Sequence, residues 1–270
     1  MADNPADREQ ALARLDTSVP HSARLWNYLL GGKDNFAPDR EAAQQVLAFL
    51  PELAQSARFT REFLGRAVRY LVVEAGIRQF LDIGTGLPTA DNTHEVAQAN
   101  AADARVVYVD NDPMVLVHAR ALLTSTPEGA TDYIDADIRE PKVILEGAAR
   151  TLDFHQPIAI MLLGILNFVT DDDEAFRIVT ELTAAAPPGS YLVISHPTRE
   201  VSPEAVDRAV SMWNAGGAAQ MTTRDPADIA GFFTGWELIE PGLVTASQWR
   251  PDGNDTTPTS EYAGVARKVG

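Results

Sequence analysis

The stretch Phe80-Leu81-Asp82-Ile83-Gly84-Thr85-Gly86 is an apolar run that ends in a turn of small residues, and a helix is predicted from near Thr89. Glycines in such a turn let the backbone approach a ligand at the carboxyl end of a strand, where open α/β sheets bind their ligands. A tight turn that binds nothing is the alternative, because a short motif is weak evidence by itself. The stretch predicts a βα unit, and other features must decide whether it holds a ligand.

Short β-rich runs alternate with helical segments after this point. The predicted strands are 79–83, 105–109, 132–135, 158–163 and 191–195, and the intervening helices begin near Thr89, Pro113, Pro141 and Asp171. This alternation is typical of an α/β protein, with a parallel sheet covered by helices on both faces. Near the end, 237–239, 242–246 and 262–267 resemble strands without a crossover helix between them. Segment 237–246 is therefore one bent strand or a tight antiparallel turn, and we predict an antiparallel C-terminal edge.

The first 76 residues predict helices ahead of the sheet. Pro38 suits a first helical turn, Ala42 and Val46 follow at helical spacing, and Pro51 marks a break. A second helix is predicted around the apolar stripe Phe59, Phe63, Ala67 and Leu71, with Gly76 as its stop. We therefore divide the chain into a helical extension, 1–76, and a sheet-containing core, 77–270.

Acidic residues follow three successive predicted strands: Asp82 within the glycine stretch, Asp110 24 residues after Gly86, and Asp137 after the third strand. The spacing to Asp110 is close to that of a carboxylate that binds ribose hydroxyls in dinucleotide folds. Thr89 stands where the dinucleotide fingerprint needs glycine, Asp82 would repel a pyrophosphate, and no P-loop motif occurs. S-adenosylmethionine, which is cationic and has no phosphate, suits these acids better, because close attraction in a partly dry pocket amounts to a few kcal/mol. A nicotinamide oxidoreductase stays open as a disfavoured alternative.

The composition excludes several other classes. The 38 acidic and 22 basic residues give a formal charge of −16, which disfavours a nucleic-acid partner. Cysteine is absent, so disulfides, thiolate nucleophiles and cysteine-ligated clusters are excluded. The start of the chain lacks a signal-peptide pattern, and the longest apolar run, 158–166, has nine residues against roughly 20 needed to span a bilayer. We expect a cytoplasmic protein with no membrane partner.

The acidic residue and glycines of Asp82-Ile83-Gly84-Thr85-Gly86 resemble the first motif of class I S-adenosylmethionine-dependent methyltransferases. The resemblance implies a Rossmann-like fold with a mostly parallel seven-stranded sheet. It also implies cofactor contacts from Asp110 to ribose, from Asp137 and Ile138 to adenine, and from Leu163 and Gly164 at the end of the fourth strand. Where the family pattern often has another glycine, this chain has Pro88.

The N-terminal stretch from Pro20 to Phe36 resembles the opening signature of an actinobacterial family of S-adenosyl methyltransferases long catalogued as a domain of unknown function. The similarity extends over nearly the whole chain, through the segments 109–113 and 235–251. It implies that S-adenosylmethionine is bound, with S-adenosylhomocysteine as product. From the two resemblances together we expect cofactor contacts from Arg24, Tyr28, Gly31, Gly32, Asn35, Asp82, Gly84, Thr85, Gly86, Asp110, Asn111, Asp137, Ile138, Leu163 and Gly164.

The composition of this stretch suggests a lid over the ligand. Tyr28, Gly31, Gly32 and Asn35 combine an aromatic ring, two flexible positions and an amide. The alternative is a helix and turn that only pack. The Gly-Gly pair favours the lid, since it contributes little to packing.

Methyl transfer from a sulfonium requires mostly positioning, with a base where the acceptor must lose a proton. His196 and Asn167, which follow the fifth and fourth strands, are the catalytic candidates, although structural roles are the alternative for both. Arg199 and Arg224 suit an anionic acceptor or, as we expect, exposed ion pairs. No histidine pair has metal-binding helical spacing, so no metal site is predicted. The sequence favours a methyltransferase acting on a small molecule, and a non-catalytic binder of the same cofactor is the rival.

Overall fold

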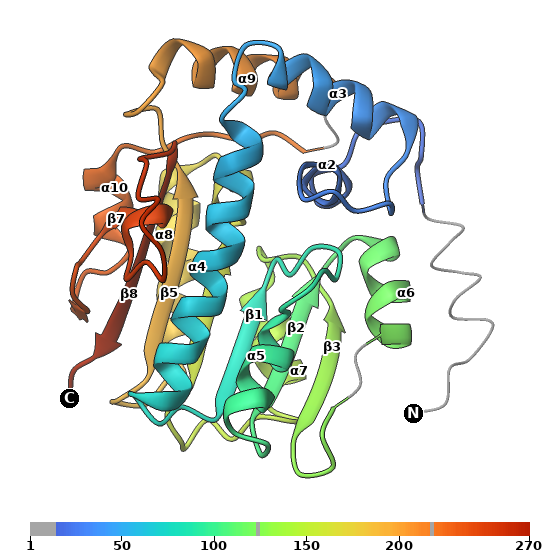
Figure 1. Ribbon diagram of the computed structural model, residues 1–270. Coiled ribbons are helices and arrows are strands. Elements are labelled where there is room, and N and C mark those ends of the chain that lie inside the picture. The colour runs from blue at the N-terminus through green and yellow to red at the C-terminus, as the bar shows by residue number, and fades with distance from the viewer. Residues whose placement is uncertain (1–14, 123–124, 217–218) are drawn as a thin grey trace.

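The computed structural model describes residues 15–122, 125–216 and 219–270, and its centre is a mixed β-sheet (Figure 1). The strand order is β3-β2-β1-β4-β5-β8-β6, with β7 also paired to β8. The strands are β1 (Gln79–Ile83), β2 (Arg105–Asp110), β3 (Ala130–Asp135), β4 (Ala159–Leu163), β5 (Tyr191–Pro197), β6 (Trp236–Leu238), β7 (Val244–Thr245) and β8 (Glu261–Lys268). Strands β1 to β5 pair in parallel, so their carboxyl ends meet at one edge of the sheet.

The C-terminal edge is antiparallel, as the sequence predicts. Strand β8 runs antiparallel to β5, and both β6 and β7 run antiparallel to β8. Trp236 pairs with Lys268 and Val244 with Ala263, so β6 and β7 follow each other in the same direction along one side of β8. Segment 237–246 is therefore one bent, interrupted strand. With β6 and β7 counted as one position, the sheet has seven strand positions in the order β3-β2-β1-β4-β5-β8-β6/β7, which is the mostly parallel seven-stranded sheet that the resemblance implies.

Helices cover both faces of this sheet. They are α2 (Ser22–Leu29), α3 (Ala37–Leu47), α4 (Leu53–Val73), α5 (Thr93–Asn100), α6 (Pro113–Leu122), α7 (Pro141–Ala148), α8 (Asp172–Ala184), α9 (Pro203–Gly216) and α10 (Pro226–Gly231), with short 3₁₀ turns η1 (Leu166–Phe168) and η2 (Ala246–Gln248). Side chains of α4 and α5 share a buried cluster with one face, and those of α7 and α8 share another with the opposite face. Figure 1 shows α4 and α5 in front of the sheet and α7 and α8 behind it. Within the described ranges, none of the helices combines the length and apolar character needed to cross a bilayer.

Helix α4 forms because its apolar residues repeat at i, i+4 and lie against the sheet. Phe63 and Leu71 are fully buried there, and the ring of Phe63 meets Trp249 edge-on with centroids 5.4 Å apart. Gly76, at φ +72°, follows the helix in the left-handed conformation that commonly ends helices. The second helix of the predicted extension is thus part of the layer that packs on the sheet.

Helix α5 begins four residues later than predicted, at Thr93 and not near Thr89. The Glu95 carboxylate accepts the backbone N–H of Asn92 at 2.8 Å, which is one half of a capping box. The cap therefore sets the start of the helix, and the turn after β1 is longer than the glycine pattern alone suggests.

A third layer of helices lies above the carboxyl ends of the strands (Figure 1). Leu25 of α2 packs in a cluster with Trp213 of α9, and Val46 of α3 packs with Val206 of α9. Helix α9 is not among the predicted elements, and it comes from the second half of the chain. This cover is thus built from segments distant in sequence, and 1–14, at the start of the predicted extension, lie outside the described residues.

We predict that Phe63→Ala lowers the free energy of unfolding by about 3–5 kcal/mol, because a fully buried ring is lost and a cavity remains. Val73→Ala in the same helix is the matched control, since Val73 is 63% exposed and its truncation should change stability by less than about 0.5 kcal/mol. Urea denaturation of both variants measures the difference. Equal effects of the two substitutions would contradict the assignment of Phe63 to the core.

Candidate functional site

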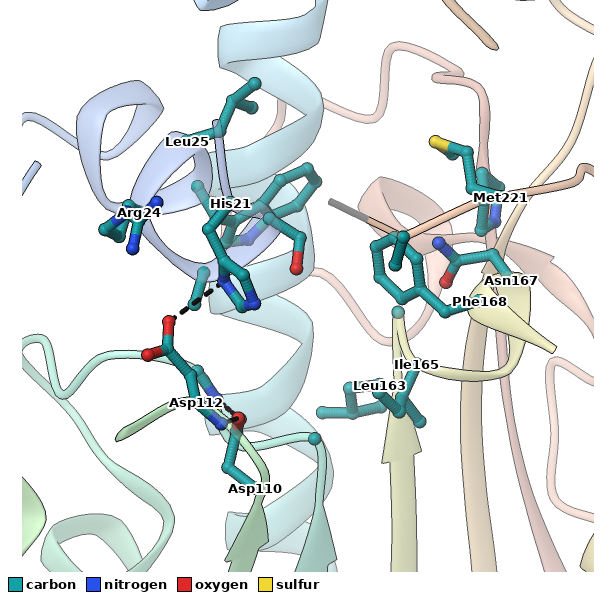
Figure 2. Close-up of a pocket in the computed structure, with 18 of the residues that line it drawn as sticks. His21, Arg24, Leu25, Asp110, Asp112, Leu163, Ile165, Asn167, Phe168 and Met221 are labelled. Carbon is teal, nitrogen blue, oxygen red and sulfur yellow. Dashed lines mark hydrogen bonds and ion pairs between the residues drawn. The ribbon is translucent and has the colours of Figure 1, made fainter. Parts of the chain in front are cut away.

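A cavity of about 600 Å³ lies between the carboxyl ends of the strands and the helical cover. This volume is within the range of small-molecule sites. In Figure 2, His21, Arg24 and Leu25 of the cover stand on one side of the cavity and Asn167, Phe168 and Met221 on the other, with Asp110, Leu163 and Ile165 below. The cavity thus opens where parallel sheets bind ligands.

Two loops at the floor of the cavity present backbone without side chains. Gly86 (φ +67°) and Gly164 (φ +64°) both line the cavity, and a Cβ on either would meet no atom within 4 Å. At Gly84 (φ +79°) there is no space for a side chain, because a Cβ would lie 2.6 Å from the side chain of Ile165. The glycines therefore bring the loops after β1 and β4 together and leave their backbone accessible to a ligand.

The three predicted acids all line this cavity. Asp82, buried on β1, accepts a hydrogen bond from Thr93 Oγ1 at 2.6 Å, and burial raises its pKa to about 6 although that bond and the charge of Arg61 oppose the shift. Burial also raises the pKa of Asp110, whose carboxylate accepts backbone N–H groups of Gly86 (2.8 Å) and Asp112 (3.0 Å). Three carboxylates on adjacent strand ends make this part of the cavity strongly negative.

Asp137, which follows β3, accepts a hydrogen bond from Asn111 Nδ2 at 3.0 Å and another from the backbone N–H of Arg139 at 2.9 Å. These bonds hold its carboxylate at the rim of the cavity. Of the other residues expected near the cofactor, the structure places Arg24, Gly84, Thr85, Gly86, Asn111, Ile138, Leu163 and Gly164 in the cavity lining.

Helix α2 covers the cavity with a face that includes the expected Arg24 but not the expected Tyr28. His21 Nδ1 lies 2.9 Å from Asp112 Oδ2, and buried Arg24 donates Nε to Asp39 at 3.0 Å. The fully buried Asp39 also accepts the backbone N–H of His21 and Phe36, at 2.9 and 2.8 Å. The contact with Asp112 ties the start of α2 to the segment after β2, and the contacts with Asp39 tie α2 to α3.

Tyr28, Gly31, Gly32 and Asn35 lie outside the cavity lining, so the structure does not bring these four residues together with the other expected contacts. They form the corner between α2 and α3. The Asn35 side chain donates to Asn27 Oδ1 and to the Gly32 carbonyl, both at 3.0 Å, and a Cβ on Gly32 would lie 2.4 Å from Asn27. Gly32 therefore has a packing role, because it makes room for this amide network, whereas Gly31 provides the left-handed backbone (φ +81°) of the turn.

His196, a catalytic candidate, also lies away from the cavity. It is fully buried and outside the cavity lining, and both ring nitrogens are engaged: Nδ1 donates to the Pro197 carbonyl at 2.8 Å and Nε2 accepts from Arg224 at 2.9 Å. Burial lowers the pKa of His196 to about 4, so the ring is neutral at physiological pH. A ring with no free nitrogen and no access to the cavity cannot act as the base.

Arg224 is buried and is not the exposed ion-pairing residue that we expected. Its guanidinium donates to the carbonyls of Leu166 (3.0 Å) and Val169 (2.8 Å), to His196, and to the exposed Asp172 carboxylate. The first two bonds hold the η1 turn. Arg199, in contrast, forms the expected exposed ion pair with Asp207.

Asn167, carried by η1, lines the cavity as a 4%-exposed residue. Its backbone carbonyl accepts Thr222 N–H at 2.8 Å, whereas its side-chain Oδ1 is buried without a hydrogen-bond partner. A buried amide oxygen that is unpaired in a rigidly held turn is available to a ligand. His196 thus supports this position through Arg224 and does not itself reach the cavity.

Comparison with known proteins identifies the family. The profile of a family described as S-adenosyl methyltransferase matches residues 8–269. The chain belongs to this family. The search of functionally curated proteins found no match to this chain.

Two family structures superpose over most of the chain. A crystal structure of a DUF574 family protein from Streptomyces avermitilis has 44% identity and a TM-score of 0.90, and the match covers 94% of this chain and all of that one. A candidate methyltransferase from Thermobifida fusca has 42% identity and a TM-score of 0.87, over 94% and 97% of the two chains. A SAM-dependent methyltransferase from Anabaena variabilis, at 13% identity and a TM-score of 0.51 over 75% and 83%, shares the fold.

Several residues that line the cavity of this protein were not predicted from its sequence. Arg61 of α4 lines the cavity, donates to the Ala90 carbonyl and to Asn92 Oδ1, and has its pKa lowered by burial against the opposing charge of Asp82. Trp213, Met221 and Glu261 line the cavity from α9, from the segment after it and from β8. No local motif marks these positions, because long-range packing brings them to the site.

Replacing the buried Arg224 should lower the free energy of unfolding more than replacing its exposed partner, Asp172. We predict that Arg224→Met lowers the free energy of unfolding by about 3 kcal/mol, because two buried carbonyls and His196 lose their donors. Asp172→Asn should cost less than about 1 kcal/mol, since the Asp172 side chain is 69% exposed. Urea titration measures the stability of both variants. An equal loss in the two variants would contradict a stabilising role of the buried Arg224 bonds.

Glu261 should make stability depend on pH. Burial raises the pKa of Glu261 to about 8 from an ordinary 4.5, so the folded protein keeps a proton that the unfolded chain has already released. Stability should therefore fall by up to about 1.4 kcal/mol per unit as the pH rises from 5 to 8 through this group alone. Glu261→Gln removes that slope, so its stability relative to wild type should increase over this range. Urea titrations at four pH values measure the difference, exposed Glu237→Gln is the matched control, and a difference independent of pH would exclude a buried ionisable Glu261.

Proposed function

We propose that this protein binds S-adenosylmethionine in the cavity and transfers its methyl group to a small molecule. The observation that carries the proposal is the set of three carboxylates, Asp82, Asp110 and Asp137, around two loops that have a glycine, Gly86 or Gly164, at the cavity. A cationic, phosphate-free nucleoside suits this field, whereas a pyrophosphate would be repelled. Membership of an S-adenosyl methyltransferase family supports the same cofactor.

Each carboxylate has a role that its position supports. Asp110 would accept the ribose hydroxyls, because each of its oxygens keeps a lone pair after bonding Gly86 and Asp112. Asp82 and Arg61 would hold the amino and carboxylate groups of the methionine part, since they place opposite charges at the same wall. Asp137 and the backbone of Ile138 would contact the adenine. The loops at Gly86 and Gly164 leave room for the nucleoside to lie against the backbone.

The bound sulfonium would supply an activated methyl group for in-line displacement. The protein's own contribution is to hold the two reactants in line and to exclude water, which can account for much of the acceleration of a bimolecular reaction. The cover of α2, α3 and α9 serves this purpose by enclosing the cavity above the strand ends. No triad of catalytic side chains is required.

We predict that the wild-type protein binds S-adenosylmethionine and S-adenosylhomocysteine in titration calorimetry and binds neither NAD nor ATP. Asp110→Ala should weaken both by about 30-fold or more, because charge-assisted hydrogen bonds to the ribose are lost. Asp103→Ala is the matched control, since the Asp103 side chain is 65% exposed and pairs with Arg78 outside this cavity. Absence of binding by the wild-type protein would refute the proposal.

Turnover is tested separately. Incubation with methyl-labelled S-adenosylmethionine and a cell extract should move the label into a small-molecule fraction, and Asp110→Ala should abolish the transfer at low cofactor concentration. Tight binding with no transfer to any fraction would instead identify a non-catalytic binder.

A further inference from the structure

The cavity extends beyond the strand ends that a nucleoside would cover. The proposed cofactor contacts end at β4, but the lining continues to Pro197 of β5 and Ser260 and Glu261 at β8. Neighbouring strands are about 4.8 Å apart, so β2 and β8, four positions apart in the sheet, are separated by roughly 19 Å. The β5–β8 end of the cavity is therefore space for a second molecule.

Unpartnered polar atoms gather at this end. Among the described residues, the buried side-chain atoms without a hydrogen-bond partner include Oδ1 of Asn167, Oγ of Ser260 and Oε1 of Glu261, and all three residues line the cavity. Asn167 and Glu261 are each only 4% exposed. Buried polar groups in folded proteins are nearly always paired, so such a group beside a cavity points to a ligand that completes it.

Backbone pairing places Asn167 and Glu261 at the same end of the cavity. Thr222 N–H donates to the Asn167 carbonyl at 2.8 Å, and Arg224 N–H donates to the Pro197 carbonyl at 3.3 Å. Pro197 is in turn the register partner of Glu261 across β5 and β8. One short segment, 222–224, therefore connects the turn that carries Asn167 to the strand pair that carries Glu261.

The wall around these polar groups is apolar. Its apolar residues are Leu50, Phe168, Val206, Val210, Trp213 and Met221, and the same segments also contribute the polar residues Glu52 and Thr223 to the lining. Figure 2 shows Phe168, Asn167 and Met221 together, across the cavity from His21 and Asp110. A molecule with an apolar frame and a single polar group fits such a lining.

The charged side chains that line the cavity determine which charge the polar group of a ligand can carry. Among the described residues, seven carboxylate side chains line the cavity (Asp16, Glu52, Asp82, Asp110, Asp112, Asp137 and Glu261) against three arginines. The arginines are already compensated: Arg24 pairs with Asp39, Arg139 with Asp137, and Arg61 lies in the field of Asp82. Arg224, the other cation considered for an anionic acceptor, has four partners of its own. The excess negative charge attracts a cation and repels a carboxylate or phosphate.

We infer that the end of the cavity formed by Asn167, Ser260 and Glu261 is the methyl-acceptor subsite, that its ligand is an apolar primary or secondary amine, and that Glu261 receives the proton of that amine. This inference rests on the proposed function. Because Glu261 holds a proton in the free protein, the entering ammonium group first displaces that proton to solvent and pairs with the resulting carboxylate. One proton then passes from the ammonium group to the carboxylate, which leaves a neutral amine and a neutral acid. The Asn167 amide oxygen accepts a remaining N–H bond and orients the nitrogen.

The transfer then balances in atoms and charge. The nitrogen lone pair forms the new N–C bond as the S–C bond breaks with its electron pair left on sulfur, so a sulfonium becomes a thioether. The methylated nitrogen takes over the positive charge. Burial raises the pKa of Glu261 to about 8, which brings it closer to that of an amine and makes the initial proton transfer easier.

The test uses protein saturated with S-adenosylhomocysteine, whose binding is measured first. Matched fragments with the same frame, phenethylamine, 2-phenylethanol and 3-phenylpropanoate, together with tryptamine, tryptophol and indole-3-propanoate, are titrated by ligand-observed NMR. The amines should bind at least tenfold more tightly than the alcohols, and the carboxylates should bind most weakly. In Glu261→Gln the preference for amines should disappear while S-adenosylhomocysteine affinity changes by less than twofold. Glu237→Gln, an exposed substitution of the same kind on β6, should retain the preference.

The outcomes separate the two proposals. Failure of the wild-type protein to bind S-adenosylhomocysteine would overturn the proposed function. If that ligand binds and no fragment does, or if alcohols or carboxylates bind as well as amines, the amine subsite is overturned. An amine preference that survives in Glu261→Gln would also overturn it. If Glu261→Gln does not fold, Asn167→Leu decides, because it should weaken amine binding at least fivefold without changing S-adenosylhomocysteine affinity.

Discussion

The loops after β1 and β4 meet at Gly84, where a Cβ would lie 2.6 Å from Ile165, and this close approach shapes the site. Strands β1 and β4 are neighbours in the sheet, but the chain between them passes through β2 and β3 on one side and continues to β5 on the other. The crevice at this reversal of direction is where open α/β sheets bind ligands. A side chain at position 84 would force the two loops apart and remove the common floor of the two proposed subsites.

Burial of acidic groups is the second feature of the site. Asp82 and Asp110 are compensated by hydrogen bonds from Thr93, Gly86 and Asp112. Glu261 keeps one unpartnered oxygen, and burial raises its pKa to about 8 although a hydrogen bond from the Ser195 side chain opposes the shift. An unpaired buried carboxyl lowers stability, because its charged form is poorly solvated. Such a group is understandable in a site where a cationic ligand supplies the missing partner. The same negative field thus explains both the proposed cofactor and the proposed acceptor.

Rigid support of the site comes from groups that do not reach the cavity. Arg224 holds the η1 turn through the carbonyls of Leu166 and Val169, and neutral His196 accepts a bond from Arg224. The Asp39 carboxylate accepts hydrogen bonds from the backbone N–H of His21, from Arg24 Nε and from the backbone N–H of Phe36. Arg224 connects residues far apart in the chain, so the position of Asn167 depends on the complete fold, whereas Asp39 connects α2 to the start of α3 within one N-terminal segment.

The sequence by itself determined the α/β class, the parallel order of strand and helix, the antiparallel C-terminal edge and the three acids at the strand ends. These features follow from local signals, namely hydrophobic periodicity, helix caps and glycine turns, which act over a few residues. Only the tertiary structure decided that His196 and Arg224 are buried partners, that Tyr28, Gly31, Gly32 and Asn35 form a corner, and that Arg61, Trp213 and Glu261 line the cavity. The corner is made of short-range contacts, but it depends on how the Asn27 and Asn35 side chains meet, which hydrophobic periodicity does not encode. For the other residues the physical reason is distance along the chain, because their burial and pairing arise from contacts between segments far apart in the sequence, on which local patterns carry no information.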